Sequence, residues 1–95
     1  MLRHEKLVTI ITTHLGELVK FTMDFKRDKR TKLTLLYEDE YGTFFEYKAI
    51  LNYATEEIEF IKHKGSTLRR EVVLGRNEVL EQELYDFMIS EICVC

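Results

Sequence analysis

The chain contains no proline, and its four glycines are scattered, so it has no Pro-rich linker or low-complexity tract that would mark a domain boundary. It also lacks any apolar run near the roughly 18 residues that a membrane-spanning helix needs. No repeat of fixed period is present. With 95 residues and no sign of an internal domain boundary, the chain is expected to form one domain over residues 1–95.

Cysteine is equally scarce, because Cys93 and Cys95 are the only two. They cannot form a disulfide framework, which predicts a reducing, cytoplasmic environment. Two thiolates are also too few for a closed zinc site, which needs four ligands, so we expect no metal and no cofactor. An intermolecular disulfide formed after purification is the more credible fate of these thiols.

An excess of positive charge is missing too. The formal net charge is −3, whereas general nucleic-acid binders are usually basic, so a nucleic-acid partner is not expected. The charge is uneven, with +4 over residues 1–37, −3 over 38–75 and −4 over 76–95. This distribution favours self-association, such as a homodimer, or an oriented partner; the simpler alternative is an ordinary solvated surface.

Catalytic motifs are absent as well. A nucleophilic site needs a nucleophile, a base and an orienting group in contact, but His4, His14 and His63 are scattered outside any such motif and read as solvent-exposed structural residues. The acids of 38–40 read as a charged turn. No phosphate-binding loop or dinucleotide fingerprint is present. The sequence therefore does not predict an enzyme.

What the chain does have is alternation of apolar and polar residues, as expected for strands with one buried face. The longest such segment spans residues 43–53, and its core-side residues are Phe45, Tyr47, Ala49, Leu51 and Tyr53. Residues 17–26 alternate in the same way, with core-side residues Val19, Phe21, Met23 and Phe25. Shorter strands are predicted over 33–37, 57–63 and 68–74.

Turns and one ambiguous segment complete the predicted sheet. Gly42 and Gly65 are predicted to lie in tight turns, because glycine accepts the positive φ that such turns require. In the strand after Gly65, Arg70 is predicted to share a face with Leu68. The six β-branched residues of 8–13 favour a strand, although the apolar spacing around them also fits a helix.

The last part of the chain changes period. Residues 77–92 are rich in helix formers, with Asn77 as a predicted N-cap and an apolar stripe at spacings of three and four. A final strand is the alternative, since Tyr85, Phe87 and Ile89 also alternate. The combined prediction is an α+β fold, mainly antiparallel β. It comprises a curved meander of about six strands or a partly open barrel over residues 6–74, followed by this helix.

Residues 35–75 resemble a family of small uncharacterised bacterial proteins with a lipocalin-like, calycin-type β-barrel. The matching segments are Leu35–Glu38 with Glu40, Lys48–Leu51, Ile61–Gly65, and Arg69 or Arg70 followed by Leu74-Gly75. Lys62 or His63 stands where that family has an arginine, and the predicted helix replaces its further strands. The resemblance implies an interior for a small apolar ligand and no catalytic residue.

Two sets of candidate functional residues follow. A ligand pocket on the sheet would be lined by Tyr37, Tyr47, Tyr53 and Phe60, with Arg70 able to hold an acidic group. The candidates for contact with another macromolecule are the basic residues Lys26, Arg27, Lys29, Arg30 and Lys32 and the acids Glu78, Glu81 and Glu83. We therefore expect a non-enzymatic binding domain for a small apolar or acidic ligand. The alternative is a small interaction protein, for example a phage or viral factor that blocks a partner.

Overall fold

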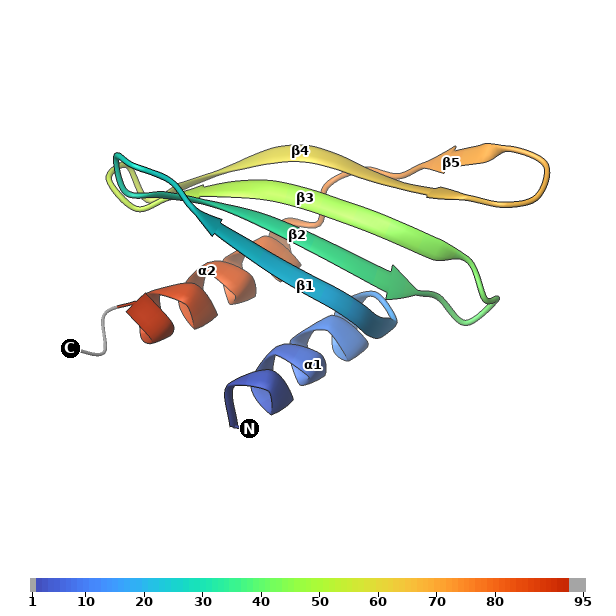
Figure 1. Ribbon diagram of the computed structural model, residues 1–95, viewed down its shortest axis with the longest axis horizontal. Helices are drawn as coiled ribbons and strands as arrows, with labels where there is room; N and C mark the ends of the chain where they lie inside the picture. The colour runs from blue at the N-terminus through green and yellow to red at the C-terminus, as the bar shows by residue number, and fades with distance from the viewer. Residues whose placement is uncertain (1, 93–95) are drawn as a thin grey trace.

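The computed structural model describes residues 2–92, so Cys93 and Cys95 lie outside the described residues. The elements, in chain order, are α1 (Leu2–His14), β1 (Glu17–Phe25), β2 (Arg30–Glu38), β3 (Phe44–Asn52), β4 (Glu57–Ser66), β5 (Glu71–Val73) and α2 (Glu78–Ile92). The strands form one antiparallel sheet in the order β1-β2-β3-β4-β5, which curves without closing, and both helices lie on the same side of it (Figure 1). The predicted α+β, mainly antiparallel class and the C-terminal helix are confirmed, with five strands in place of about six.

The missing strand is the first one, because residues 8–13 belong to helix α1, and the prediction of a strand there is wrong. The helix buries Leu7 and Ile11, which lie four residues apart and so share one helical face. The Thr13 hydroxyl donates a hydrogen bond to the Thr9 carbonyl oxygen at 2.7 Å. Burial of one apolar face against the sheet therefore outweighs the weak helix propensity of β-branched residues.

The predicted alternation in β2 and β3 is confirmed. Every second residue of these strands points to the helix-covered face and is buried: Leu33, Leu35, Tyr37, Phe45, Tyr47, Ala49 and Leu51. Helix α2 supplies the opposing layer with the predicted apolar stripe, of which Leu80, Leu84, Phe87 and Met88 are buried. One core between the sheet and the two helices results.

Strand β1 departs from its predicted pattern. Its pairing with β2 shifts between Leu18 and Lys20, so Val19 forms a bulge in the strand. Consequently Leu18 packs against the core while Val19 stays about half exposed. Phe25, at the end of the strand, is 60% exposed. The core-side assignment holds for Phe21 and Met23 and is wrong for Val19 and Phe25.

The two predicted glycine turns have opposite outcomes. Gly42 lies in the β2–β3 turn with φ of 81°, as predicted. Gly65 is instead a buried residue inside β4, where an added Cβ would lie 2.6 Å from the ring of Phe45. It is glycine because that ring lies against its backbone. The chain reverses two residues later, where the N–H of Thr67 donates to the carbonyl of Arg70 at 2.9 Å.

Candidate functional site

The four aromatic residues predicted to line a pocket do share one face of the sheet, but the helices cover that face. Tyr37 and Tyr47 are buried, and Tyr53 and Phe60 are partly buried against the same core. The rings of Tyr47 and Phe60 meet edge to face with centroids 5.6 Å apart. The ring of Tyr53 lies 5.7 Å from that of Tyr85 on α2. These aromatic side chains therefore fill the space between the sheet and the helices.

Arg70 does not join them. It lies in the exposed turn between β4 and β5, at the end of the sheet that also carries the β2–β3 turn (Figure 1). Leu68, predicted to share a strand face with Arg70, is completely exposed in the same turn, so the strand predicted over 68–74 is wrong for these residues. The aromatic side chains and the proposed anchor for an acidic group are thus in different parts of the molecule.

Glu81, predicted to contact a partner from the surface, is instead almost completely buried in α2. The Tyr47 hydroxyl donates a hydrogen bond to Glu81 Oε2 and accepts one from the Asn77 N–H at 2.9 Å. Nε and Nη2 of Arg76 donate to Glu81 Oε1 at 3.1 and 2.5 Å. A buried carboxylate is tolerated when it is paired and hydrogen-bonded in this way. Glu81 therefore ties the start of α2 to the sheet and is not available to a partner.

The pKa values agree with these assignments. Burial raises the pKa of the Tyr47 hydroxyl, an effect that the adjacent Glu81 carboxylate reinforces and the hydrogen bond from Asn77 opposes. The hydrogen bond and charge of Glu81 raise the pKa of the Arg76 guanidinium. Tyr47 therefore remains a neutral donor, and Arg76 remains the positive partner of the buried carboxylate.

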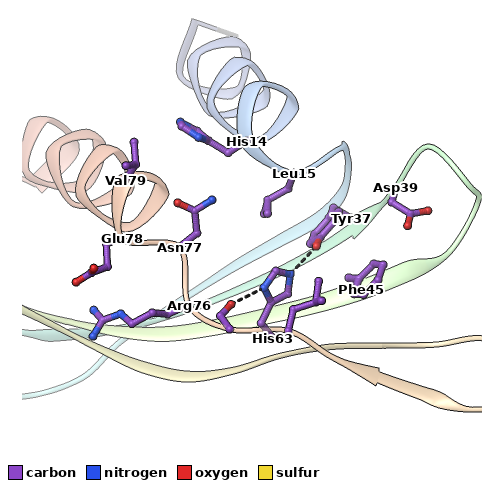
Figure 2. Close-up of a pocket in the computed structure, with 12 residues that line it drawn as sticks. His14, Leu15, Tyr37, Asp39, Phe45, His63, Arg76, Asn77, Glu78 and Val79 are labelled. Atoms are coloured by element: carbon purple, nitrogen blue, oxygen red, sulfur yellow. Dashed lines mark hydrogen bonds between the residues drawn. The ribbon is translucent and has the colours of Figure 1, made fainter.

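A second polar cluster centres on His63. This residue is buried, and the prediction from the sequence that it is solvent-exposed is wrong. Nδ1 of His63 lies 3.0 Å from the Gly75 carbonyl oxygen, and Nε2 lies 2.5 Å from the Tyr37 hydroxyl (Figure 2). Since a carbonyl oxygen only accepts, we assign the imidazole proton to Nδ1, and Tyr37 then donates to Nε2. The ring thus links β2, β4 and the segment that leads into α2.

Burial lowers the pKa of His63, although its hydrogen bond to Gly75 partly opposes this effect. Burial also raises the pKa of Tyr37 to about 12, with a further contribution from the charge of Asp39. Both groups are therefore neutral at physiological pH. A hydroxyl with so high a pKa is a hydrogen-bond donor and a poor nucleophile.

A hollow of about 600 Å³ lies above this cluster, where the C-terminal end of α1 faces the first turn of α2 (Figure 2). We call it the junction hollow. Leu15, Tyr37, His63, Arg76 and Asn77 are among its lining residues. The polar side chains among these already form hydrogen bonds within the chain: His63 with Tyr37 and Gly75, and Arg76 with Glu81. The Asn77 side chain accepts a hydrogen bond from the N–H of Leu80, as predicted for the N-cap of α2.

The remaining charged candidates are dispersed. The Glu83 carboxylate lies within hydrogen-bond distance of Nε2 of half-buried His14, a contact that joins α2 to α1, and Glu78 is exposed. The basic residues Lys26, Arg27, Lys29, Arg30 and Lys32 occupy the β1–β2 turn and the start of β2, at the opposite end of the sheet from Arg70 (Figure 1). Asp28 and Lys29 have positive φ values of 63° and 58°, as in a two-residue hairpin turn.

Exposed apolar side chains gather at the Arg70 end. A shallow hollow of about 610 Å³ between the β2–β3 and β4–β5 turns is lined by Tyr41, Phe44, Leu68 and Arg69, which we call the hairpin-tip surface. Tyr41 is 84% exposed and Phe44 is half exposed. Aromatic and arginine residues are enriched where protein interfaces concentrate their binding energy.

The β4–β5 turn holds its part of this surface in a defined conformation. The Thr67 hydroxyl oxygen accepts hydrogen bonds from the N–H groups of Arg69 and Arg70, at 3.3 and 3.2 Å, and donates to the Arg70 carbonyl at 3.1 Å. This is a side-chain-stabilised turn, so Leu68 and Arg69 are presented on an ordered backbone. The sequence carried a signal for it in Ser66-Thr67, because Ser and Thr hydroxyls can hydrogen-bond to the backbone two residues further on in turns.

Comparison with known proteins identifies no relative. A scan against protein-family models, a search of curated proteins and a search of solved structures each found no match. The resemblance to the lipocalin-like family is therefore neither supported nor contradicted. Among the side chains that the structure describes, those of residues 5–90, no three His, Cys, Asp or Glu residues gather closely enough to hold a metal ion. Neither α1 nor α2 combines the length and the apolar character that crossing a membrane would require.

Proposed function

We propose that this chain is a non-enzymatic interaction domain that binds a protein partner through the hairpin-tip surface. The observation that carries the proposal is the complete exposure of Leu68 in a hydrogen-bonded turn, beside exposed Tyr41 and Phe44. The hydrogen bonds hold the turn backbone around Leu68, so this residue loses little backbone freedom on binding, and its exposed side chain gains the full benefit of burial. An interaction protein was the alternative expected from the sequence.

The charge at this surface defines the chemistry of the partner. Among residues 5–90, whose side chains the structure describes, the guanidinium groups of Arg69 and Arg70 take part in no ion pair or side-chain hydrogen bond, whereas nearby Lys64 and Glu71 pair with each other at 3.2 Å. Two uncompensated arginines beside an apolar surface favour an apolar groove flanked by carboxylates. The proposed partner is therefore an acidic protein surface with a central apolar groove.

The test compares the immobilised wild-type chain with Leu68→Ser and with the control Val79→Ser in a lysate of the source cells. Val79 is also a largely exposed aliphatic residue, but it lies in α2, away from the β4–β5 turn. A partner retained by wild type and by Val79→Ser is then purified and titrated by calorimetry. We expect Leu68→Ser to weaken the measured affinity at least about tenfold, which corresponds to the loss of one buried leucine contact.

Arg70→Ala and Arg69→Ala should weaken the same titration and reduce its dependence on salt, because each removes a charge from the interface. If the purified partner binds Leu68→Ser as tightly as wild type, the hairpin-tip surface is not the binding site. Charge reversal at Glu78 provides a further control, since this exposed residue lies on α2.

A small ligand in the junction hollow is a second candidate, favoured by a volume within the range of known ligand sites, about 300–1,000 Å³. It replaces the predicted pocket over the four aromatic residues, since the helices cover that face. Native mass spectrometry of freshly purified, reduced protein would test it. A bound mass that is lost in a Leu15→Arg variant of unchanged fold supports this ligand, and a clean protein mass opposes it.

A further inference from the structure

Strand β1 is an edge of the sheet along its whole length. It pairs with β2 on one side, and within residues 2–92 no strand pairs with its other side. An unpaired edge of nine residues offers a row of backbone donors and acceptors to another strand. What could pair with it depends on the side chains that it presents.

The side chains of β1 are complementary to those of a second β1 running in the opposite direction. If the two strands pair with Thr22 opposite Thr22, Lys20 of each copy faces Asp24 of the other. The same register places Phe21 opposite Met23, again twice. Directly opposite side chains of this kind, a cation with an anion and an aromatic ring with a thioether, stabilise antiparallel pairs.

The exposed apolar residues of β1 fit the same register. Val19 and Phe25 are 51% and 60% exposed, which is unusual for large apolar residues of a strand with one core face. With Thr22 opposite Thr22, they lie opposite each other at both ends of the paired segment. The bulge and the strand end that expose them thus supply apolar contact to a neighbouring copy.

The other uncovered edge does not have this property. Strand β5 pairs only with Lys64–Ser66, so the first part of β4 also lacks a neighbour on that side. There Glu57 and Glu59 flank Ile58, and a second β4 centred on Ile58 would place like charges opposite each other. In addition, Arg76 Nη2 donates to the Ile58 carbonyl at 3.3 Å and so occupies part of this edge.

We infer that β1 is a dimerisation strand. Two copies of the chain pair β1 against β1 about a two-fold axis at Thr22, which joins their sheets into one continuous antiparallel sheet. The contact is self-complementary and closes after two copies, whereas β1 against β4 would be open-ended. This inference is independent of the proposed function, because the hairpin-tip surface contains no residue of β1.

The test uses charge reversal in sedimentation equilibrium, with reductant present because of Cys93 and Cys95. Wild type should form a dimer. Lys20→Asp leaves acids opposite Asp24, and Asp24→Lys leaves lysines opposite Lys20, so each variant alone should dimerise at least about tenfold more weakly. An equimolar mixture of the two variants should recover the dimer, because every charge then faces its opposite.

Both positions are exposed, so circular dichroism should show an unchanged fold. Asp24→Lys also removes the ion pair between Asp24 and Lys26, but this exposed pair contributes little, and Lys20→Asp retains it. Glu59→Lys is the matched control, since it reverses a charge on β4 and should leave dimerisation unchanged.

A cross-link provides a second readout in a chain with Cys93→Ser and Cys95→Ser. Thr22→Cys should form an intermolecular disulfide on mild oxidation, because the two-fold axis brings the two side chains together. Thr34 lies on β2, directly opposite Thr22 of the same chain. Thr34→Cys is therefore away from the axis and should form no intermolecular disulfide. A wild-type chain that stays monomeric at high concentration overturns the inference, as does a mixture of charge variants that fails to associate.

Discussion

Replacing Tyr47 by phenylalanine should destabilise the protein strongly, although it removes a single oxygen atom. The ring of Tyr47 is fully buried, and its hydroxyl joins the Glu81 carboxylate to the N–H of Asn77. In the Tyr47→Phe variant the ring still fills its place in the core. The change therefore isolates the contribution of the two hydrogen bonds that attach α2 to the sheet.

The magnitude follows from what is left behind. A hydrogen bond to a charged group contributes about 1.5–3 kcal/mol, and a neutral bond contributes about 1 kcal/mol. Removing the Tyr47 hydroxyl leaves a buried carboxylate oxygen of Glu81 and a partly buried N–H of Asn77 without that partner. We therefore expect the free energy of unfolding to fall by about 2–4 kcal/mol. For a domain of this size that corresponds to a loss of about 10–20 °C in Tm.

Thermal unfolding followed by far-UV circular dichroism measures this shift directly. Tyr41→Phe is the matched control, because it deletes the same atom from a residue that is 84% exposed, and its Tm should stay within a few degrees of wild type. If the two variants lose the same small amount of stability, the hydroxyl of Tyr47 does not hold α2 to the sheet. A double-mutant cycle with Glu81→Gln measures the coupling energy between the Tyr47 hydroxyl and the Glu81 carboxylate directly.

The other predictions concern packing, pH and charge. Gly65→Ala should lower the stability by about 1–3 kcal/mol in urea unfolding because its Cβ would overlap an aromatic ring, whereas Gly75→Ala, whose Cβ meets nothing within 4 Å, should not. The folded-state pKa of His63 lies below its ordinary 6.5, so its contribution is complete above that pH and is lost as the pH falls through the folded-state pKa. His63→Asn should therefore flatten the dependence of the urea midpoint on pH as the pH falls below 6.5. Glu81→Lys should prevent stable folding as judged by circular dichroism, whereas exposed Glu78→Lys should change the stability by less than about 0.5 kcal/mol. An equal loss of stability in Gly65→Ala and Gly75→Ala would contradict the close contact between Gly65 and the ring of Phe45. An equal loss in Glu81→Lys and Glu78→Lys would contradict the role of Glu81 in the buried cluster.

The two buried polar clusters explain why the helix layer is positioned as it is. Glu81 and His63 both bond to the short segment that leads into α2, through Arg76 and through the Gly75 carbonyl. Arg76 carried no signal of this role beyond being the only basic residue after Gly75. A buried polar network penalises other packings of the same helix, since each would leave a charge or donor unsatisfied.

The sequence by itself determined the elements in which buried side chains recur at a regular period. Strands β2 and β3 and the stripe of α2 were predictable because a period of two or of 3.6 records which side chains are buried. The antiparallel class also followed, since short segments and turns leave little room for crossover connections.

The tertiary structure decided the features that depend on a distant partner. Residues 8–13 became a helix because the sheet buries one of its faces, and Gly65 stayed in a strand because the ring of Phe45 lies against it. Glu81 is buried because Arg76 and Tyr47 satisfy its carboxylate. These outcomes rest on contacts between residues that only folding brings together, and no local pattern of residues contains them.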